Sequence, residues 1–270
     1  MIVHLLQPQV CERFKNDAHY REGHLRVVNA LPHRLVLGLH SPEMKQTAKL
    51  ISRSGCDIVM PDGSHRTCCT GREVIRHFES APSSSLCYEE TVIWGFLINL
   101  EKCTLEERMA MLEHYVPVLD NWAVCDSYCA NAKWMVRTDK ETLWTFLQRY
   151  FHSEHEFEIR FAIVAAMTHL LKDEWLERVF QQLDRLDFTR IVSKYTAIKG
   201  KPKTAQQGTA PGAAPYYVRM AVAWLLATAL AKFPEQTRTF ARSSRLPDDV
   251  IRLYVRKARE SLVTRDVAAL

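Results

Sequence analysis

Four side chains in this sequence have types and spacings that suit the binding of a sugar and a phosphate. Trp122 and Asp126 are four residues apart, so on a helix both would stand on one face. Arg160 opens an apolar run at 161–167, where a buried guanidinium requires an anionic partner. Trp224 lies within a second apolar run, 220–230, and offers a large flat surface with one polar atom. A carboxylate, a guanidinium and two indoles together predict a sugar-phosphate site.

Each of these residues also has an ordinary structural interpretation. A tryptophan in an apolar helix, such as Trp224, is commonly a core residue, and Asp126 could be a surface or capping carboxylate. Arg160 could pair with Glu156 or Glu158 instead of a phosphate. The residue types alone therefore leave both interpretations open.

Length and composition indicate an ordinary soluble globular protein. The chain has 270 residues, 47% hydrophobic and 25% charged, which is enough to bury a large core. The longest apolar stretches, near 91–98 and 220–231, are too short to span a bilayer, and no export signal is visible. We therefore expect a cytoplasmic protein that does not insert into membranes.

The cysteines do not form a metal-binding pattern. Eight are dispersed along the chain, and Cys125 and Cys129 have a helical spacing without a second Cys/His pair at zinc-site distance. Buried reduced thiols are the favoured interpretation over zinc. We expect neither a metal nor an organic cofactor.

Basic charge is concentrated in the C-terminal part of the chain. Residues 188–270 hold 15 Lys and Arg against 5 Asp and Glu, whereas residues 1–187 hold 21 against 26. Such an asymmetry is typical of a protein that contacts a polyanion through its phosphates, although a solvated helix would show it too.

Helical periodicity runs through nearly the whole chain and predicts an all-α fold. Thr104 and Glu107 form a capping box, and Cys56–Met60 is at best a short extended piece before a turn at 61–63. From about residue 88 the helices fall into antiparallel pairs of about 35–45 residues, the period of HEAT-like α-solenoids. We predict one such domain, 1–270, whose concave face binds DNA. The expected helices are 9–29, 42–54, 70–80, 88–100, 105–116, 121–133, 139–151, 156–171, 173–186, 216–232, 234–243 and 247–260.

The segment 194–215 interrupts this pattern. It is rich in Gly, Pro, Ala and Lys and has little to bury, which predicts a flexible loop or insertion. Lys199, Lys201 and Lys203 could grasp phosphates from such a loop, or the segment could be a solubilising linker.

Four short sequence motifs resemble those of a known family. They are Tyr-Glu-Glu at 88–90, Asp-Asn-Trp-Ala-Val-Cys-Asp-Ser at 120–127, Glu-Ile-Arg-Phe-Ala-Ile at 158–163, and the stretch 216–224 that ends in Trp224. In this order the chain resembles the AlkD-type DNA alkylation repair proteins, HEAT-like repeat DNA glycosylases that excise alkylated purines. The resemblance covers roughly residues 35–265.

The resemblance implies a role for each site residue. Trp122 and Trp224 would cradle the deoxyribose, Asp126 would be the catalytic carboxylate, and Arg160 would anchor the DNA backbone. A cationic N3- or N7-alkylpurine leaves without protonation, and a carboxylate and indole faces stabilise the resulting oxocarbenium-like sugar.

Two further basic residues are expected to contact the DNA backbone: Arg219, which lies within the motif at 216–224, and Lys133, which follows the motif at 120–127. The implied partner is duplex DNA containing alkylated bases, bound by a monomer in the cytoplasm in association with the nucleoid. A protein that recognises the lesion through contacts with its sugar and phosphate does not need a pocket for a flipped base. Neutral lesions such as uracil are therefore not expected to be released.

The competing hypothesis is a non-catalytic scaffold of the same architecture. It would bind DNA structures or a protein partner through its concave surface, because a fold does not by itself determine a function.

Overall fold

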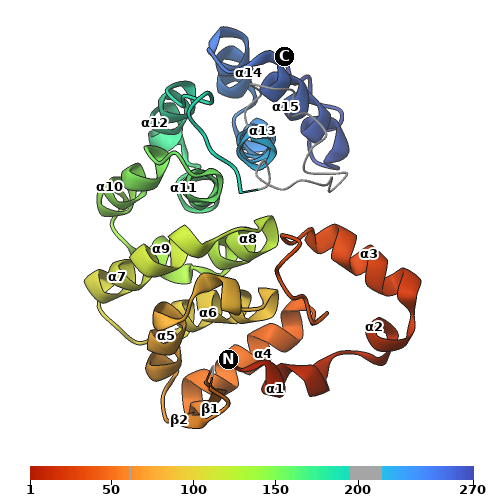
Figure 1. The fold of residues 1–270 in the computed structure, drawn as a ribbon. Helices are drawn as coiled ribbons and strands as arrows, with labels where there is room; N and C mark the ends of the chain where they lie inside the picture. The colour runs from red at the N-terminus through yellow and green to blue at the C-terminus, as the bar shows by residue number, and fades with distance from the viewer. Residues whose placement is uncertain (61, 195–214) are drawn as a thin grey trace. The chain divides into compact units, whose positions relative to one another are not determined.

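The computed structural model describes residues 1–60, 62–194 and 215–270, which form two compact units, Met1–Lys133 and Trp134–Leu270 (Figure 1). The described residues contain fifteen α-helices and one two-stranded hairpin. The all-α class is thus confirmed, with a small β element added to it. The continuous solenoid with a concave face stays a prediction, and the predicted loop at 194–215 lies almost wholly outside the described residues.

The first unit contains eight helices among its described residues, together with short 3-10 turns at Gln7–Gln9, Ser83–Ser85 and Val116–Val118. In chain order the helices are α1 (Val3–Leu6), α2 (Glu12–Asn16), α3 (Ala18–Val28), α4 (Ser41–Ser54), α5 (Gly71–Ser80), α6 (Tyr88–Leu100), α7 (Leu105–Tyr115) and α8 (Trp122–Asn131).

Helix α6 is the core of the first unit, and it packs against α4, α5, α7 and α8. After the two glutamates of its first turn it is apolar on nearly all sides, and almost the whole helix is buried, as expected for a helix surrounded by others. Gly95 allows a close approach, because a Cβ there would lie 2.3 Å from the Tyr115 Oη atom. The Tyr115 hydroxyl instead donates a hydrogen bond to the Thr91 carbonyl at 3.2 Å, and so ties α7 to α6.

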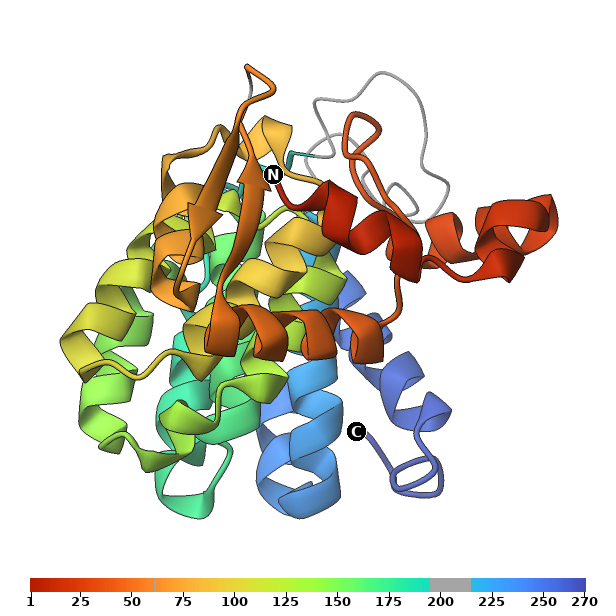
Figure 2. The same ribbon diagram turned by 90° about the horizontal axis from the view of Figure 1, so that it is seen from below.

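The hairpin consists of β1 (Cys56–Val59) and β2 (His65–Cys68), paired antiparallel with Cys56 opposite Cys68. It lies beside α1, where the Val59 N–H donates to the Met1 carbonyl at 2.9 Å (Figure 2). The extended piece expected at Cys56–Met60 is therefore half of a real ladder.

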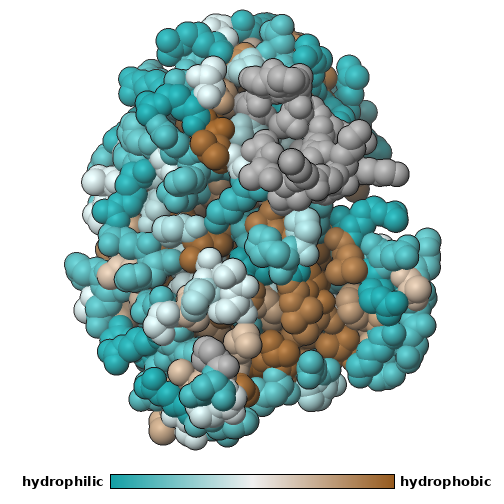
Figure 3. All heavy atoms as spheres, viewed as in Figure 1, coloured by the Kyte–Doolittle hydropathy of each residue, from teal (hydrophilic) through white to brown (hydrophobic). Residues whose placement is uncertain are grey.

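Apolar side chains remain at the surface of the first unit near the segment that joins α3 to α4. Leu31, Leu37 and Leu39 of this segment are buried, whereas Leu35 is exposed, as is Val27 at the end of α3. The hydrophobic surface over this part of the unit is visible in Figure 3.

The second unit is built around two buried helices, α11 (Glu156–His169) and α13 (Tyr216–Lys232), which pack against each other. Helix α10 (Lys140–Phe151) packs on α11, and α14 (Pro234–Ser243) and α15 (Asp248–Glu260) pack on α13. The remaining helices are α9 (Lys133–Arg137), which begins at the last residue of the first unit, and α12 (Asp173–Asp184). No helix in the described ranges has the length and apolar composition needed to cross a membrane.

Candidate functional site

Helix α8 presents Trp122 and Asp126 on one partly exposed face. Its opposite face, which includes Tyr128 and Cys125, is buried against α6. The Asn121 side chain caps the helix by accepting the Ala123 N–H at 2.8 Å. The predicted pairing of an indole and a carboxylate on one accessible helix face is therefore present within the first unit.

The end of α3 is fastened to the start of α8. The last carbonyls of a helix have no partner within it, and side-chain donors can satisfy them. The Asn121 Nδ2 atom donates to the Val28 carbonyl at 2.7 Å, and the Trp122 Nε1 atom donates to the Val27 carbonyl at 3.1 Å. Asn29 follows in the left-handed conformation, with φ of 49°, and ends the helix. The candidate-site indole thus holds an N-terminal helix in place.

A buried ion pair fixes the loop that precedes α8. Arg34 and Asp120 are only 8% and 4% exposed, and the Arg34 Nε atom lies 3.1 Å from Asp120 Oδ2. The Arg34 Nη1 atom also donates to the Leu86 carbonyl at 2.7 Å. Asp120, the first residue of one of the four sequence motifs, therefore positions the loop that precedes α8.

The Tyr-Glu-Glu motif at 88–90 begins α6 as expected, but its carboxylates form hydrogen bonds within the fold. Glu89 is fully buried and accepts the backbone N–H groups of Leu37 and Gly38 at 3.0 and 2.8 Å. Burial raises the pKa of the Glu89 carboxyl group, and these hydrogen bonds offset part of the rise. The motif thus anchors the segment that joins α3 to α4, a role that the sequence did not predict.

In the second unit, Arg160 links α11 to α13. Its side chain is 3% exposed, its Nη1 atom donates to the Tyr217 carbonyl at 2.8 Å, and its guanidinium lies 5.7 Å from the centre of the Tyr217 ring. Glu156 accepts the Tyr217 N–H at 2.7 Å and also the Ser193 hydroxyl. Burial raises the pKa of Glu156, and its two hydrogen bonds and the charges of Arg160 and Arg219 offset part of that rise. The contacts of Arg160 with Tyr217 lie inside the second unit, and an ion pair of Arg160 with Glu156 or Glu158 and a contact with DNA phosphate both stay predictions.

The two other predicted backbone contacts have different surroundings. Arg219 on α13 is 4% exposed and forms an ion pair with Asp249 of α15. Lys133 is exposed at the start of α9, where its ammonium group can reach solvent. Of these two residues, Lys133 is the more accessible to a polyanion.

Trp224 lies on the partly exposed stripe of α13, together with Tyr216, Met220 and Thr228 at four-residue intervals. It lines a pocket of about 300 Å³ with Lys257 and residues that follow α15. The indole is therefore accessible, as the site prediction requires, although the helix around it is otherwise buried.

The six predicted site residues are divided between the units. Trp122, Asp126 and Lys133 belong to the first, and Arg160, Arg219 and Trp224 belong to the second. The geometry brings Trp122 together with Asp126 on α8, and their assembly with the other residues around one nucleotide stays a prediction. No group of three or more His, Cys, Asp or Glu side chains converges to hold a metal in the described part of the chain.

Comparison with known families gives one match, which covers the central segment of the chain. Residues 87–190 match the family of DNA alkylation repair enzymes. The resemblance to the AlkD-type DNA alkylation repair proteins is thus confirmed over this segment, which runs from the start of α6 past the end of α12. No curated protein and no solved structure matches the chain. The matched segment contains Trp122, Asp126 and Arg160, whereas Trp224 lies beyond it.

Proposed function

We propose that this protein is a monofunctional DNA glycosylase that releases cationic N3- and N7-alkylated purines from duplex DNA. The supporting observation is that Trp122 and Asp126 share a partly exposed face of α8, inside the segment that matches DNA alkylation repair enzymes. Both groups can thus approach one sugar on the DNA surface.

The proposed chemistry follows from the charge of the lesion. An alkylated purine is a cation, so its glycosidic bond breaks without protonation of the base. The sugar then gains positive charge, which the Asp126 carboxylate stabilises while it orients the attacking water. The indole faces of Trp122 and Trp224 favour the same charge. The products are the free base and an abasic site, and no step requires a metal, an organic cofactor or an amine nucleophile.

An exposed row of arginines supports DNA as the partner. Arg252, Arg256 and Arg259 of α15 are all exposed and recur at helical spacing. Helix α15 packs on α13, which carries Trp224. The proposed phosphate contacts thus lie on a helix that packs against the Trp224 helix, and Lys257 of the same α15 lines the pocket of Trp224.

The second candidate function is a DNA-binding scaffold without catalysis. Arg160 and Arg219, the two buried arginines of the predicted site, hold α13 through internal contacts. Such contacts would be retained in a protein that keeps the fold and has lost base excision.

The deciding experiment measures release of the base from duplex DNA containing N7-methylguanine. The proposal expects release of the methylated base with no cleavage of the strand. A matched duplex containing uracil is the control, and its base should remain attached because it is neutral. Binding to the methylated duplex without base release would favour the scaffold.

The salt dependence of DNA binding tests the arginine row. A plot of log affinity against log salt concentration has a negative slope for a protein that neutralises phosphates. In the triple variant Arg252→Gln/Arg256→Gln/Arg259→Gln, the magnitude of this slope is expected to fall by about 0.9 for each phosphate that the protein no longer neutralises. The control is Arg53→Gln, which removes an exposed arginine at the end of α4. An unchanged slope in the triple variant would exclude α15 from the DNA interface.

We further propose that the protein acts as a monomer in the cytoplasm, in association with DNA. Sedimentation of the purified protein tests the first point, and recovery of the protein with chromosomal DNA in cell fractionation tests the second.

A further inference from the structure

Two adjacent apolar side chains project into solvent directly after α15. Leu262 is 81% exposed and Val263 is 71% exposed, the two highest values among the large apolar residues that the structure describes. A single exposed apolar residue is ordinary at a protein surface, but two neighbours with so little cover require an explanation. We call Leu262 and Val263 the apolar tip.

The chain is fastened to α15 directly after the apolar tip. The Thr264 side chain is buried, and its hydroxyl donates to the Ala258 carbonyl near the end of α15 at 2.8 Å. Further along, the Ala269 carbonyl accepts the hydroxyl of the buried Tyr254 at 2.7 Å. The exposure of the apolar tip is therefore a property of a held turn, and a frayed chain end does not account for it.

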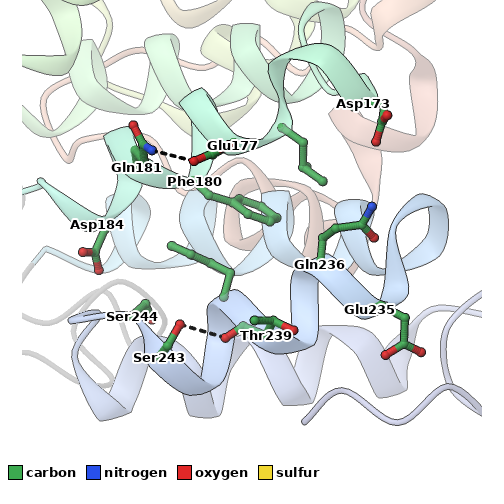
Figure 4. A pocket seen from close by; sticks show the side chains of 12 residues that line it. Asp173, Glu177, Phe180, Gln181, Asp184, Glu235, Gln236, Thr239, Ser243 and Ser244 are labelled. Carbon is green, nitrogen blue, oxygen red and sulfur yellow. Dashed lines mark hydrogen bonds between the residues drawn. The ribbon is translucent and has the colours of Figure 1, made fainter.

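The groove between α12 and α14 in the same unit, with a volume of about 690 Å³, has no comparable exposed apolar side chain (Figure 4). Phe180 on its floor is only 5% exposed and stacks on Phe240 with the ring centres 4.4 Å apart. Two of its carboxylates, Asp184 and Glu235, already form ion pairs. The groove is thus largely satisfied by its own side chains, whereas the apolar tip is not.

The apolar tip is continuous with the pocket of Trp224. Val263 lines this pocket of about 300 Å³ together with the indole of Trp224 and with Lys257. The proposed function places the Trp224 indole against the sugar of the damaged nucleotide. A duplex bound in that way would bring its nearest groove to the apolar tip.

The surroundings of the apolar tip are basic. Residues 252–270 hold five lysines and arginines against two acidic residues, a net charge of +3. The acidic residues, Glu260 and Asp266, pair with Lys257 at 2.7 Å and with Arg265 at 3.4 Å. Duplex DNA fits this surface, because it combines anionic phosphates with apolar base faces. Two apolar side chains alone bury too little area to anchor a protein to a membrane.

We propose that the apolar tip enters the minor groove of duplex DNA beside the damaged nucleotide, with Leu262 wedged between neighbouring base pairs. Proteins that bind the minor groove use apolar wedges of this kind to unstack a base step. Exposed arginines of α15 would bind the phosphates at the edges of the groove. The wedge would loosen the stack at the lesion without a pocket for the base. This proposal rests on the proposed function, which supplies the position of the damaged nucleotide.

The first test measures affinity for a duplex whose N7-methylguanosine carries a 2′-fluorine, which slows base loss because it destabilises the oxocarbenium-like sugar. Leu262→Ser/Val263→Ser is expected to weaken binding about tenfold, because two apolar side chains no longer leave water on binding. The slope of log affinity against log salt concentration should stay unchanged, because no cation is removed.

Two further variants serve as controls for affinity. Leu262→Met/Val263→Ile keeps the apolar character of the tip and should bind within about threefold of wild type. Leu50→Ser removes an exposed apolar side chain from α4 in the first unit and should leave the affinity unchanged.

The second test detects the wedge itself. The base analogue 2-aminopurine, placed next to the methylated guanine of the same duplex, becomes more fluorescent when it leaves the base stack. Wild type and Leu262→Met/Val263→Ile should raise the fluorescence on binding. Leu262→Ser/Val263→Ser should not raise it, even at a protein concentration that saturates the duplex.

The outcomes separate this proposal from the proposed function. Unchanged fluorescence with wild type, or equal affinity of wild type and Leu262→Ser/Val263→Ser, would overturn the wedge, while base release from the duplex without fluorine would leave the glycosylase in place. Absence of both binding and base release would overturn the two together. Binding to vesicles of phosphatidylserine and phosphatidylcholine that the serine variant loses, with DNA affinity unchanged, would assign the apolar tip to a lipid surface instead.

Discussion

The variant Asp126→Asn is expected to release methylpurine about 100- to 1,000-fold more slowly than wild type, the usual loss when one group that stabilises transition-state charge is removed. The amide keeps the shape of the side chain and removes the negative charge that, in the proposed mechanism, stabilises the oxocarbenium-like sugar. Asp126 is partly exposed on α8, so the substitution should leave the fold intact. Affinity for the methylated duplex should change by less than about threefold, or roughly 0.65 kcal/mol.

Single-turnover base release and DNA affinity should be measured together for this variant. Ser127→Ala is the matched control, because it alters the next residue of the same partly exposed face without changing charge. Wild-type rates in Asp126→Asn would remove this carboxylate from the mechanism. Loss of DNA affinity in parallel with activity would instead assign Asp126 to binding.

The variant Asp120→Asn is expected to lower the free energy of unfolding by about 3–5 kcal/mol, the usual cost of removing one partner from a buried ion pair. The Arg34 guanidinium would then be buried opposite a neutral amide, with only carbonyl groups such as that of Leu86 to accept its hydrogen bonds. Urea unfolding followed by circular dichroism measures the loss. Because the pair lies immediately before α8, base release should fall at temperatures where the loop loosens.

A double-mutant cycle separates the ion pair from general damage. Arg34→Met/Asp120→Leu removes both charges and should be less destabilised than the sum of the two single variants. Simple additivity of the two losses would show that Arg34 and Asp120 act independently.

Long helices with clear ends were predictable from the sequence. The ranges 88–100, 216–232 and 234–243 agree with α6, α13 and α14 to the residue, and the capping box of Thr104 and Glu107 opens α7. Short elements were not predicted. The range 9–29 is divided at Asp17, which caps α3 by accepting the Tyr20 N–H, and the helices α1 and α9 contain only four and five residues. Helices of that length are stable only through tertiary contacts, and the periodicity of a short stretch of sequence does not predict such contacts.

The candidate site shows the same division between local and distant information. The shared face of Trp122 and Asp126 follows from a four-residue spacing and is present on α8. The contact of Trp122 with Val27 joins residues 95 positions apart, and the internal contact of Arg160 with Tyr217 joins residues 57 apart. No spacing rule reaches that far, so sequence reasoning could offer the nearby carboxylates Glu156 and Glu158 as partners for Arg160 but could not find Tyr217.

The hydrogen bond between Trp122 and the Val27 carbonyl makes the end of α3 and the indole thermodynamically linked. A ligand that rotates the indole away from Val27 must break this hydrogen bond, which leaves the end of α3 held by Asn121 alone and therefore weakens its attachment. Linkage is reciprocal. If the attached turn of α3 raises the affinity for a ligand that requires the present indole orientation, that ligand stabilises the attached turn by the same factor. Hydrogen exchange at the amides of α3 therefore reports occupancy of the face of α8 without any label on the DNA.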